Sequence, residues 1–408
     1  YKVWEYDAYE PSSWQLGDSV DIVDEGIWNI SCKSEDNAGN VAVIETQVKI
    51  DKTNPTVSDD APTEQTWLVH FVTVNITAND KLSGIASIEY KKWRTDENEP
   101  SFWNSGNTIN LTTDGKWYIR YRVMDNASNR AVTVREIWID TTAPSTSANI
   151  TSGYYNTDVV IELTASDITS GISQTKYKID GNEYTGNTFP IFAPANHSND
   201  GNHTIEFYSI DVAGNVESTH TIWVVIDTRT PEAILSASPS EPNGDNGWYT
   251  STVTVNLCYS EEITNSSVTI LYRMDDNPSY EIYNDPFEIR DGIHTMYYYA
   301  VDEAGNMGGV RNKTFYVDYT APVTATDWDC SIEYTNRDVW INLSAEDTTS
   351  GIADIYYSID YGNFVSGDTI VIEAFSNHTN DGLHTIRYYS TDNAGNLESI
   401  RWINVTID

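Results

Sequence analysis

Aspartates recur at two fixed places along this chain, and a carboxylate at either place could bind a hard cation. The first place is a turn of the pattern Asp-x-Ala-Gly/Ser-Asn, which begins at Asp36, Asp125, Asp211, Asp302 and Asp392. The second place closes the strand that follows each turn, at Asp51, Asp140, Asp227, Asp318 and Asp408. Carboxylate oxygens are ligands that Ca²⁺ prefers. The competing interpretation is that each aspartate is a turn residue that hydrogen-bonds its own backbone.

The charge balance favours cations as partners. The chain has 61 acidic and 23 basic residues, a formal net charge of -38. Nucleic acid and anionic lipid both need a basic surface, so neither is expected as a partner. We also expect no membrane insertion within the chain, because it contains no run of 18 apolar residues.

No catalytic motif accompanies the acidic residues. The sequence lacks a nucleophile elbow, a Gly-rich phosphate loop and a pair of cysteines with zinc-ligand spacing. Paired carboxylates are common in so acidic a chain and therefore carry no catalytic signal. We expect the chain not to be an enzyme.

The repeated turns divide the chain into units. They recur at a nearly constant spacing that matches the length of one small domain, so the sequence predicts a tandem array. The predicted units are a C-terminal half repeat at 1–51, full repeats at 52–140 and 141–227, a divergent repeat at 228–318 and a last repeat at 319–408. Cys32, Cys258 and Cys330 fall in three different units, so no unit is expected to close an internal disulfide.

Residues 1–51 align without a gap onto residues 90–140, the second half of the next unit. Half a repeat would expose a sheet edge and half a core, which soluble proteins avoid. We therefore expect a window from a longer array, with more repeats on both sides. The alternative is that a neighbouring subunit donates the missing strands.

Alternating apolar residues predict strands inside each unit. Val159, Ile161 and Leu163 alternate with polar residues, and the same register recurs at Val72, Val253 and Val339. Short segments of period two, separated by Gly, Asn and Asp turns, indicate an all-β fold with about seven antiparallel strands in two sheets. In unit 141–227 we expect Val159, Ile161, Ile205 and Phe207 to be buried.

The joints between units share one pattern. An aspartate is followed at the fourth position by proline, at Asp51–Pro55, Asp140–Pro144, Asp227–Pro231 and Asp318–Pro322. Proline fixes its own φ and restricts the preceding residue to extended geometry. So short a connection predicts a stiff joint rather than a flexible tether.

The Asp-x-x-Ser-Gly-Ile loop, the Asp-x-Ala-Gly-Asn turn and the Asp-x-x-x-Pro joint together resemble the tandem bacterial and archaeal immunoglobulin-like repeats of extracellular surface proteins. The resemblance covers the whole chain. It implies a linear array of immunoglobulin-like antiparallel β-sandwiches at the cell surface.

The strand order of that family implies that three carboxylates meet at each joint. The strand-closing aspartate of one repeat would lie beside the B–C and F–G loops of the next repeat. The implied sets are Asp51, Asp80 and Asp125; Asp140, Asp167 and Asp211; Asp227, Glu261 and Asp302; and Asp318, Asp347 and Asp392. We expect each set to bind structural Ca²⁺.

Twelve Asn-x-Ser/Thr sequons make N-linked glycans another expectation. They are Asn29, Asn75, Asn110, Asn126, Asn149, Asn196, Asn202, Asn265, Asn312, Asn342, Asn377 and Asn404. The alternation places Asn75 and Asn342 on the outward face of their strands. The tryptophans and tyrosines could form a sugar-binding platform, but core and cross-strand pairs are the stronger interpretation. Trp93 and Trp103, with Trp4 and Trp14 at the matching positions, are the best candidates for exposure.

Three functions fit these observations. The first is a non-enzymatic structural array in a cell-surface stalk, a surface layer or a fibre, whose partners are further repeats or neighbouring subunits. The second is a carbohydrate- or cell-binding adhesin that recognises surface glycans. The third is a spacer in a large secreted hydrolase.

Overall fold

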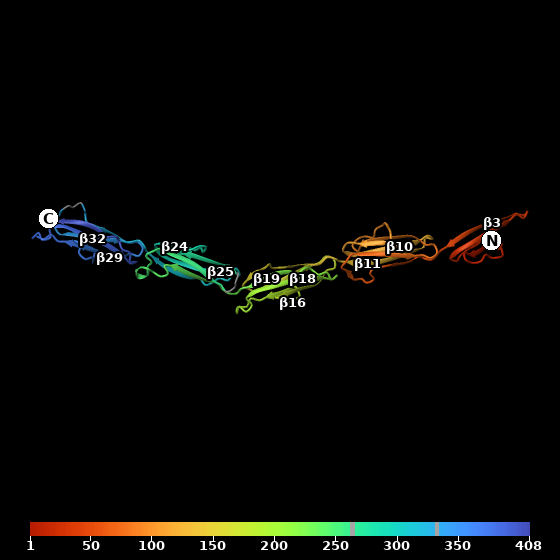
Figure 1. Cartoon of the computed structure of the whole chain (residues 1–408), viewed down its shortest axis with the longest axis horizontal. Helices are drawn as coiled ribbons and strands as arrows, with labels where there is room; N and C mark the ends of the chain where they lie inside the picture. The colour runs from red at the N-terminus through yellow and green to blue at the C-terminus, as the bar shows by residue number, and fades with distance from the viewer. Residues whose placement is uncertain (262–265, 331–333) are drawn as a thin grey trace. The chain divides into compact units, whose positions relative to one another are not determined.

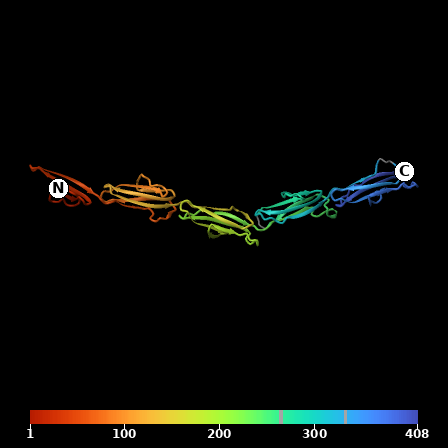
Figure 2. The same ribbon diagram turned by 180° about the vertical axis from the view of Figure 1, so that it is seen from behind.

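The computed structural model describes residues 1–261, 266–330 and 334–408 and is built from β-strands. In the described part, helical structure is limited to a three-residue 3-10 turn at Asp245–Gly247. The expected all-β fold of antiparallel sheets is confirmed. Figure 1 labels strands along the chain, and Figure 2 gives the view from behind.

The chain divides into two compact units. One comprises residues 1–151, 160–190 and 204–223, and the other comprises residues 152–159, 191–203 and 224–408. The division passes through the expected repeat 141–227, so the five-repeat organisation stays a prediction.

Residues 1–51 form one antiparallel sheet in the order β1 (Lys2–Glu5), β2 (Gly26–Glu35) and β3 (Val41–Ile50). Gly26 lies opposite Ile50, and Glu35 lies opposite Val41. Val43 and Ile44 on β3 are exposed.

Residues 52–140 form two sheets around one core. The first sheet has the order β4 (Thr56–Asp59), β6 (Val72–Asn79) and β9 (Thr108–Leu111). The second has the order β5 (Trp67–Leu68), β11 (Arg130–Ile139), β10 (Gly115–Asp125), β7 (Ile85–Arg94) and β8 (Asn104–Ser105). Val74 and Ile76 from the first sheet share a cluster with Ile119, Tyr121 and Val123 from the second. This packing of two inner faces is that of a β-sandwich.

The next segment repeats these elements as β12 (Ser145–Ala148), β13 (Gly153–Tyr155), β14 (Val159–Ser166), β15 (Ile172–Ile179), β16 (Asn182–Thr185), β17 (Thr188–Ile191), β18 (Gly201–Asp211) and β19 (His220–Ile226). Within it, β12 pairs with β14 and β15 pairs with both β16 and β18, all antiparallel. Val159, Ile161, Ile205 and Phe207 are all buried, as expected from the alternation.

Two further sandwiches follow. Residues 232–317 contain β20 (Glu232–Ser238), β21 (Val253–Ser260), β22 (Val268–Met274), β23 (Glu281–Ile282), β24 (Phe287–Ile289), β25 (Gly292–Asp302) and β26 (Arg311–Val317). Residues 323–407 contain β27 (Val323–Thr326), β28 (Val339–Glu346), β29 (Ile352–Ile359), β30 (Val365–Ser366), β31 (Thr369–Ile372), β32 (Gly382–Asp392) and β33 (Arg401–Ile407). Each has a three-stranded sheet facing a four-stranded sheet across an apolar core.

A short strand that runs parallel to the last strand was not expected from the sequence. β5 pairs with β11 in this way, and β13 pairs with β19. Single parallel bridges at Tyr249–Val317 and Thr335–Ile407 take the same place in the two later sandwiches. These pairs raise the number of strand segments above the expected seven.

The turn between the last two strands has the expected left-handed residue. Gly214 has a φ of +99°, and Ser128 at the equivalent position has a φ of +74°. A side chain at such a φ costs about 1–2 kcal/mol, which glycine avoids. The substitution by serine therefore leaves local strain at this one turn.

Candidate metal centres

Four groups of three carboxylates occur in the part of the chain that the structure describes. In each group, one oxygen from each residue lies within 4.8 Å of the others. The groups are Asp51, Asp80 and Asp125; Asp140, Asp167 and Asp211; Asp227, Glu261 and Asp302; and Asp318, Asp347 and Asp392. The structure thus brings together all twelve residues of the four sets.

The strand order explains why these side chains meet. The first member of each group directly follows the last strand of an expected repeat, as Asp140 follows β11. The second member directly follows the strand with the alternating core residues, as Asp167 follows β14. The third member ends the long strand before the Ala-Gly-Asn turn, as Asp211 ends β18.

The second member caps its own loop. Asp167 Oδ1 accepts hydrogen bonds from the backbone N–H groups of Thr169 (3.1 Å), Ser170 (2.9 Å) and Gly171 (2.7 Å). Asp80 does the same, and hydrogen bonds led by the Gly84 N–H lower its pKa. This geometry explains the Asp-x-x-Ser-Gly motif, since the loop must turn its N–H groups toward one carboxylate.

The third member orders the last turn and connects it to the joint. Asp211 Oδ1 accepts the Asn215 N–H at 2.8 Å, and Asp211 Oδ2 accepts the Asn215 Nδ2 at 2.8 Å. The same Nδ2 donates to the backbone carbonyl of Asp140 at 2.8 Å. Equivalent bonds run from Asn129 to Asp51 (3.0 Å), from Asn306 to Asp227 (2.8 Å) and from Asn396 to Asp318 (2.9 Å). The asparagine of each motif therefore links the turn to the joint.

In three of the groups the first member is the most deeply buried, whereas at the first joint Asp51 is half-buried and Asp125 is the buried member. Asp140, Asp227 and Asp318 each have 0% of their surface exposed. Asp140 Oδ2 accepts the Ser170 N–H at 3.0 Å, and Asp318 Oδ2 accepts the Ser350 N–H at 3.0 Å. Burial, reinforced by repulsion from the two neighbouring carboxylates, raises the pKa of Asp140 and of Asp318.

The group at Asp227 differs from the others. Its loop lacks the Ser-Gly-Ile sequence, and Asp227 Oδ2 is buried with no hydrogen-bond partner in the part of the chain that the structure describes. Asp227 Oδ1 accepts the Arg229 N–H at 3.1 Å. Burial, followed by repulsion from Asp302, Glu261 and Asp200, raises the pKa of Asp227 to about 6. Asp51, Asp140 and Asp318 each accept a serine N–H at Oδ2, whereas Asp227 Oδ2 accepts none from the described residues.

The residues fit a hard cation. Ca²⁺ binds oxygens at about 2.3–2.6 Å, so two ligands of one ion can be up to about 5 Å apart. The oxygens of each group meet that limit. Asp227 Oδ2, which no described residue pairs, lacks the compensation that a cation would provide.

A second set of acidic residues, which was not identified from the sequence, binds the threonines that follow the joint aspartates. Asp114 Oδ1 accepts the Thr141 N–H (3.0 Å), and Asp114 Oδ2 accepts the Thr142 hydroxyl (2.7 Å) just after Asp140. Glu25 binds Thr53, Asp200 binds Thr228, and Asp291 binds Thr320 in the same way. The available signal was an acid directly before the glycine that opens a long strand, combined with a threonine in the following joint.

The sequons differ in how their side chains are used. Of those in the described residues, all except the half-buried Asn29 are exposed, and Asn265 lies outside the described residues. Asn75 and Asn342 do point outward, but each Nδ2 donates to an aspartate, Asp60 at 2.9 Å and Asp327 at 2.7 Å. Asn126 Nδ2 donates to the Ser83 carbonyl at 2.8 Å.

The expectation for exposed tryptophans is only partly met. Trp14 is 39% exposed, whereas Trp93 is buried at 8%. Trp93 packs against Tyr118, with ring centroids 5.5 Å apart, and the Arg120 guanidinium lies 5.8 Å from its ring. Trp93 is therefore not exposed, and it forms the cross-strand aromatic pair that the stronger interpretation predicted.

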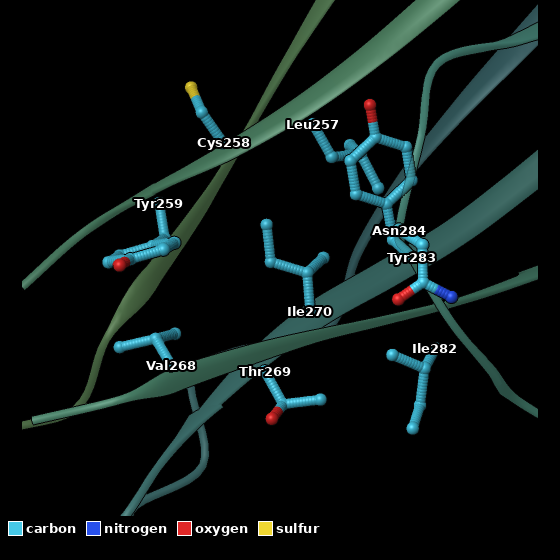
Figure 3. A pocket seen from close by; sticks show the side chains of 9 residues that line it. All are labelled: Leu257, Cys258, Tyr259, Val268, Thr269, Ile270, Ile282, Tyr283 and Asn284. Carbon is cyan, nitrogen blue, oxygen red and sulfur yellow. The ribbon is translucent and has the colours of Figure 1, made fainter.

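An open pocket of about 480 Å³ lies between β21 and β22. Its lining is largely apolar and includes Leu257, Ile270 and Tyr283. Figure 3 shows Tyr259 turned toward Val268, and Cys258 turned away from both. The lining residues do not bring together groups for catalysis or metal binding.

Comparison with known proteins supports the fold. Residues 152–228 match the family model described as bacterial Ig-like domain. No curated protein matches the chain.

Solved structures of low similarity include multidomain β proteins. The fibronectin(III)-like modules of Clostridium thermocellum CbhA share 16% identity over 42% of this chain and 94% of that chain, with a TM-score of 0.21. A tetra-tandem repeat from the extending region of a large adhesion protein shares 15% identity over 87% of this chain and 99% of that one, with a TM-score of 0.28. The ICAM-5 D1-D4 ectodomain fragment shares 8% identity over 87% of this chain and 100% of that one, with a TM-score of 0.40. Likenesses this weak support no argument about function.

Among the described residues, no helix has the length and apolar character needed to cross a bilayer.

Proposed function

We propose that this chain is a non-enzymatic structural segment of an extracellular surface protein, built from tandem bacterial immunoglobulin-like repeats. The match of residues 152–228 to the bacterial Ig-like domain model supports the proposal. The chain would serve in a stalk, a surface layer or a fibre, with joints stiffened by Ca²⁺. The proposed repeats are 1–51, 52–140, 141–227, 228–318 and 319–408, and the proposed partners are further repeats or neighbouring subunits.

The observation that carries the cation proposal is the environment of Asp227. Its Oδ2 is buried and has no hydrogen-bond partner among the described residues, while carboxylates of Glu261 and Asp302 lie within 4.8 Å. A buried charge without compensation is costly, and three carboxylates at this distance repel one another. A divalent cation would remove both costs.

The residues around each group explain how a bound cation would stiffen the chain. At the Asp140 joint, the backbone carbonyl is bound by Asn215 and the side chain by Ser170. On the other side, Thr141 and Thr142 are bound by Asp114. The short linker is therefore attached at both ends, and a cation shared by the three carboxylates would hold the strand end against both loops. Extracellular sites often bind Ca²⁺ with a Kd of about 10⁻⁴–10⁻³ M.

Calorimetric titration of the full chain with Ca²⁺ tests the proposal. We expect four sites, one for each group of carboxylates. Asp211→Asn should remove one site, because Asp211 belongs to one group. Glu162→Gln is the matched control, because Glu162 is an exposed acid outside the groups and its loss should leave all four sites.

Two further measurements follow the consequence for stiffness. Excess chelator should lower the melting temperature and change the small-angle scattering curve of the wild-type chain. Scattering curves that coincide with and without chelator, together with no heat of Ca²⁺ binding, would refute the cation proposal.

We also propose that N-linked glycans occupy some exposed sequons. Asn196 and Asn377 are the preferred positions, because they lie in equivalent exposed loops. Their side-chain oxygens accept the N–H groups of Ser198 and Thr379, both at 3.2 Å, so the hydrogen bonds go to oxygen rather than to the nitrogen that carries a glycan. Glycopeptide mass spectrometry of protein from its native source should find these two modified, and Asn75 and Asn342 unmodified.

A further inference from the structure

The charge of the chain is distributed very unevenly. Residues 52–140 contain 10 basic and 12 acidic residues, a formal net charge of -2. The rest of the chain contains 13 basic and 49 acidic residues, a formal net charge of -36. Residues 52–140 are therefore almost neutral, whereas the rest of the chain is acidic enough to repel other copies of the chain electrostatically.

Five of the ten basic residues of this segment lie on the outward face of its larger sheet. On β10, Ile119, Tyr121 and Val123 point into the core, so Lys116, Tyr118, Arg120 and Arg122 point outward. Across β10 and β7, Arg120 lies opposite Lys91. Across β10 and β11, Met124 lies opposite Arg130. We call the outward side chains of β7, β10 and β11 the basic face.

The basic face keeps a positive excess after its internal pairing. Arg122 binds Glu89 at 2.6 Å, and Glu99 binds both Arg120 (2.7 Å) and Lys91 (3.4 Å). With Glu136, and with Glu99 from the loop after β7, three acids accompany five bases, Lys91, Lys116, Arg120, Arg122 and Arg130, of which Lys91 is buried at 7%. The positive charge is therefore real but moderate.

Apolar side chains lie beside these charges. Val132 and Val134 on β11 are 49% and 44% exposed. Val132 lies opposite Arg122, and Val134 lies opposite Arg120. Exposed valines next to arginine combine an apolar contact with charge recognition, which is common in protein interfaces.

We propose that the basic face is a lateral docking surface for a second copy of this chain, and that it receives an acidic segment of that copy. Charge complementarity favours this partner, because the copy carries a net charge of -36 outside its own residues 52–140. Two acidic segments from different copies repel each other electrostatically. An acidic segment of one copy and the basic face of another attract each other. Repeated lateral contacts of this kind would join single chains into a layer or bundle.

An acidic polysaccharide is the other partner that a basic face can attract. The exposed valine pair favours protein, because a sugar acid would place hydroxyl groups against it. The ion pairs within the face also favour a protein partner, because Arg120 and Arg122 already bind carboxylates of protein side chains there.

Sedimentation velocity of the full chain tests the proposal, with chelator present so that joint cations and cation bridges play no part. We expect association at about 20 mM salt that is lost at about 500 mM, because the Debye length falls from roughly 20 Å to roughly 4 Å. The variant Arg130→Glu/Val132→Asp should weaken association by roughly tenfold or more. Arg337→Glu has the same change of charge as Arg130→Glu at an exposed position outside the face, and should leave association within about twofold of wild type.

Circular dichroism of each variant separates loss of docking from loss of folding. A chain that stays monomeric at low salt and at about 100 μM would overturn the proposal. A Kd above that concentration corresponds to a free energy of association of less than about 5.5 kcal/mol. Equal association of the wild type and the Arg130→Glu/Val132→Asp variant would overturn it as well. If the chain stays monomeric and binds alginate, and the Arg130→Glu/Val132→Asp variant does not bind alginate, the proposed partner is wrong. The basic face would then be a binding site for an acidic polysaccharide.

Discussion

Replacing Asp227 by asparagine should stabilise its joint when no cation is present. The pKa of Asp227 rises from 3.8 to about 6, mainly through burial and then through repulsion by neighbouring carboxylates. A difference of this size corresponds to about 3 kcal/mol between the two protonation states. The neutral amide removes this cost, and its oxygen can still accept the Arg229 N–H that Asp227 Oδ1 accepts now.

The pH dependence has a definite sign. Below pH 3.8 the carboxyl is protonated in both the folded and the unfolded chain, so it imposes no cost. Between pH 3.8 and about 6 the unfolded chain releases the proton first, so the metal-free fold loses stability as the pH rises. Above pH 6 the full cost applies. The Asp227→Asn variant should lack this decline.

Hydrogen exchange measured by mass spectrometry on the full chain, in excess chelator, reports the effect at the joint itself. Peptides covering residues 225–230 and 300–306 should exchange more slowly in Asp227→Asn than in wild type above pH 6. Asp140→Asn is the matched control, because Asp140 Oδ2 already accepts the Ser170 N–H and an amide nitrogen there would meet a donor. Equal slowing at both joints, or faster exchange in Asp227→Asn, would contradict this account of the buried charge. Added Ca²⁺ should slow exchange at this joint in the wild type and have little effect in Asp227→Asn.

Three other changes test the fold. Ser128→Gly should raise the free energy of unfolding by up to about 1 kcal/mol, measured in urea, because Ser128 has a φ of +74°; Ala127→Gly, at a position without positive φ, should give no such gain. Ile341→Ala should lower the free energy of unfolding by about 2–5 kcal/mol in the same assay, because Ile341 is fully buried; a loss under about 1 kcal/mol would mean that this core is loosely packed. His384 should titrate above its ordinary pKa in an NMR experiment, since burial opposes its protonation but hydrogen bonds with the Asn380 carbonyl and Asp360 outweigh that effect. Its stabilising contribution is full below pH 6.5 and is lost as the pH rises through the raised pKa; an unchanged titration in Asp360→Asn would exclude Asp360 as a cause.

Strand positions could be predicted from the sequence because burial on one face imposes a period of two. Val159, Ile161 and Ile205 were placed in the core by alternation alone, and all three are buried. The three-carboxylate groups needed more than alternation. The strand order implied by the family resemblance placed Asp140 beside Asp167 and Asp211, and the structure brings them together.

Other features depend on contacts between distant residues, which produce no periodic pattern in the sequence. The strand β5 is too short to show alternation, and its parallel partner β11 lies far along the chain, at the other end of the same sandwich sequence. The bond from Asn75 Nδ2 to Asp60 gives an outward-facing sequon an internal role that exposure alone could not reveal. Trp93 is covered by Tyr118 and Arg120 from the adjacent strand, which a prediction from single-strand patterns could not anticipate.

The parallel pairing near the ends of the sandwiches has a mechanical consequence. Tension that pulls β13 and β19 in opposite directions along their axes loads their shared hydrogen bonds in shear, so that these bonds must break together rather than one after another. Three residue pairs join β13 to β19 and two pairs join β5 to β11, whereas single bridges join Tyr249 to Val317 and Thr335 to Ile407 in the described part of the chain. The sandwiches of residues 232–317 and 323–407 therefore have the fewest parallel hydrogen bonds that resist this shear. As the tension rises, these two sandwiches would unfold first, and their extension would limit the force on the rest of the chain.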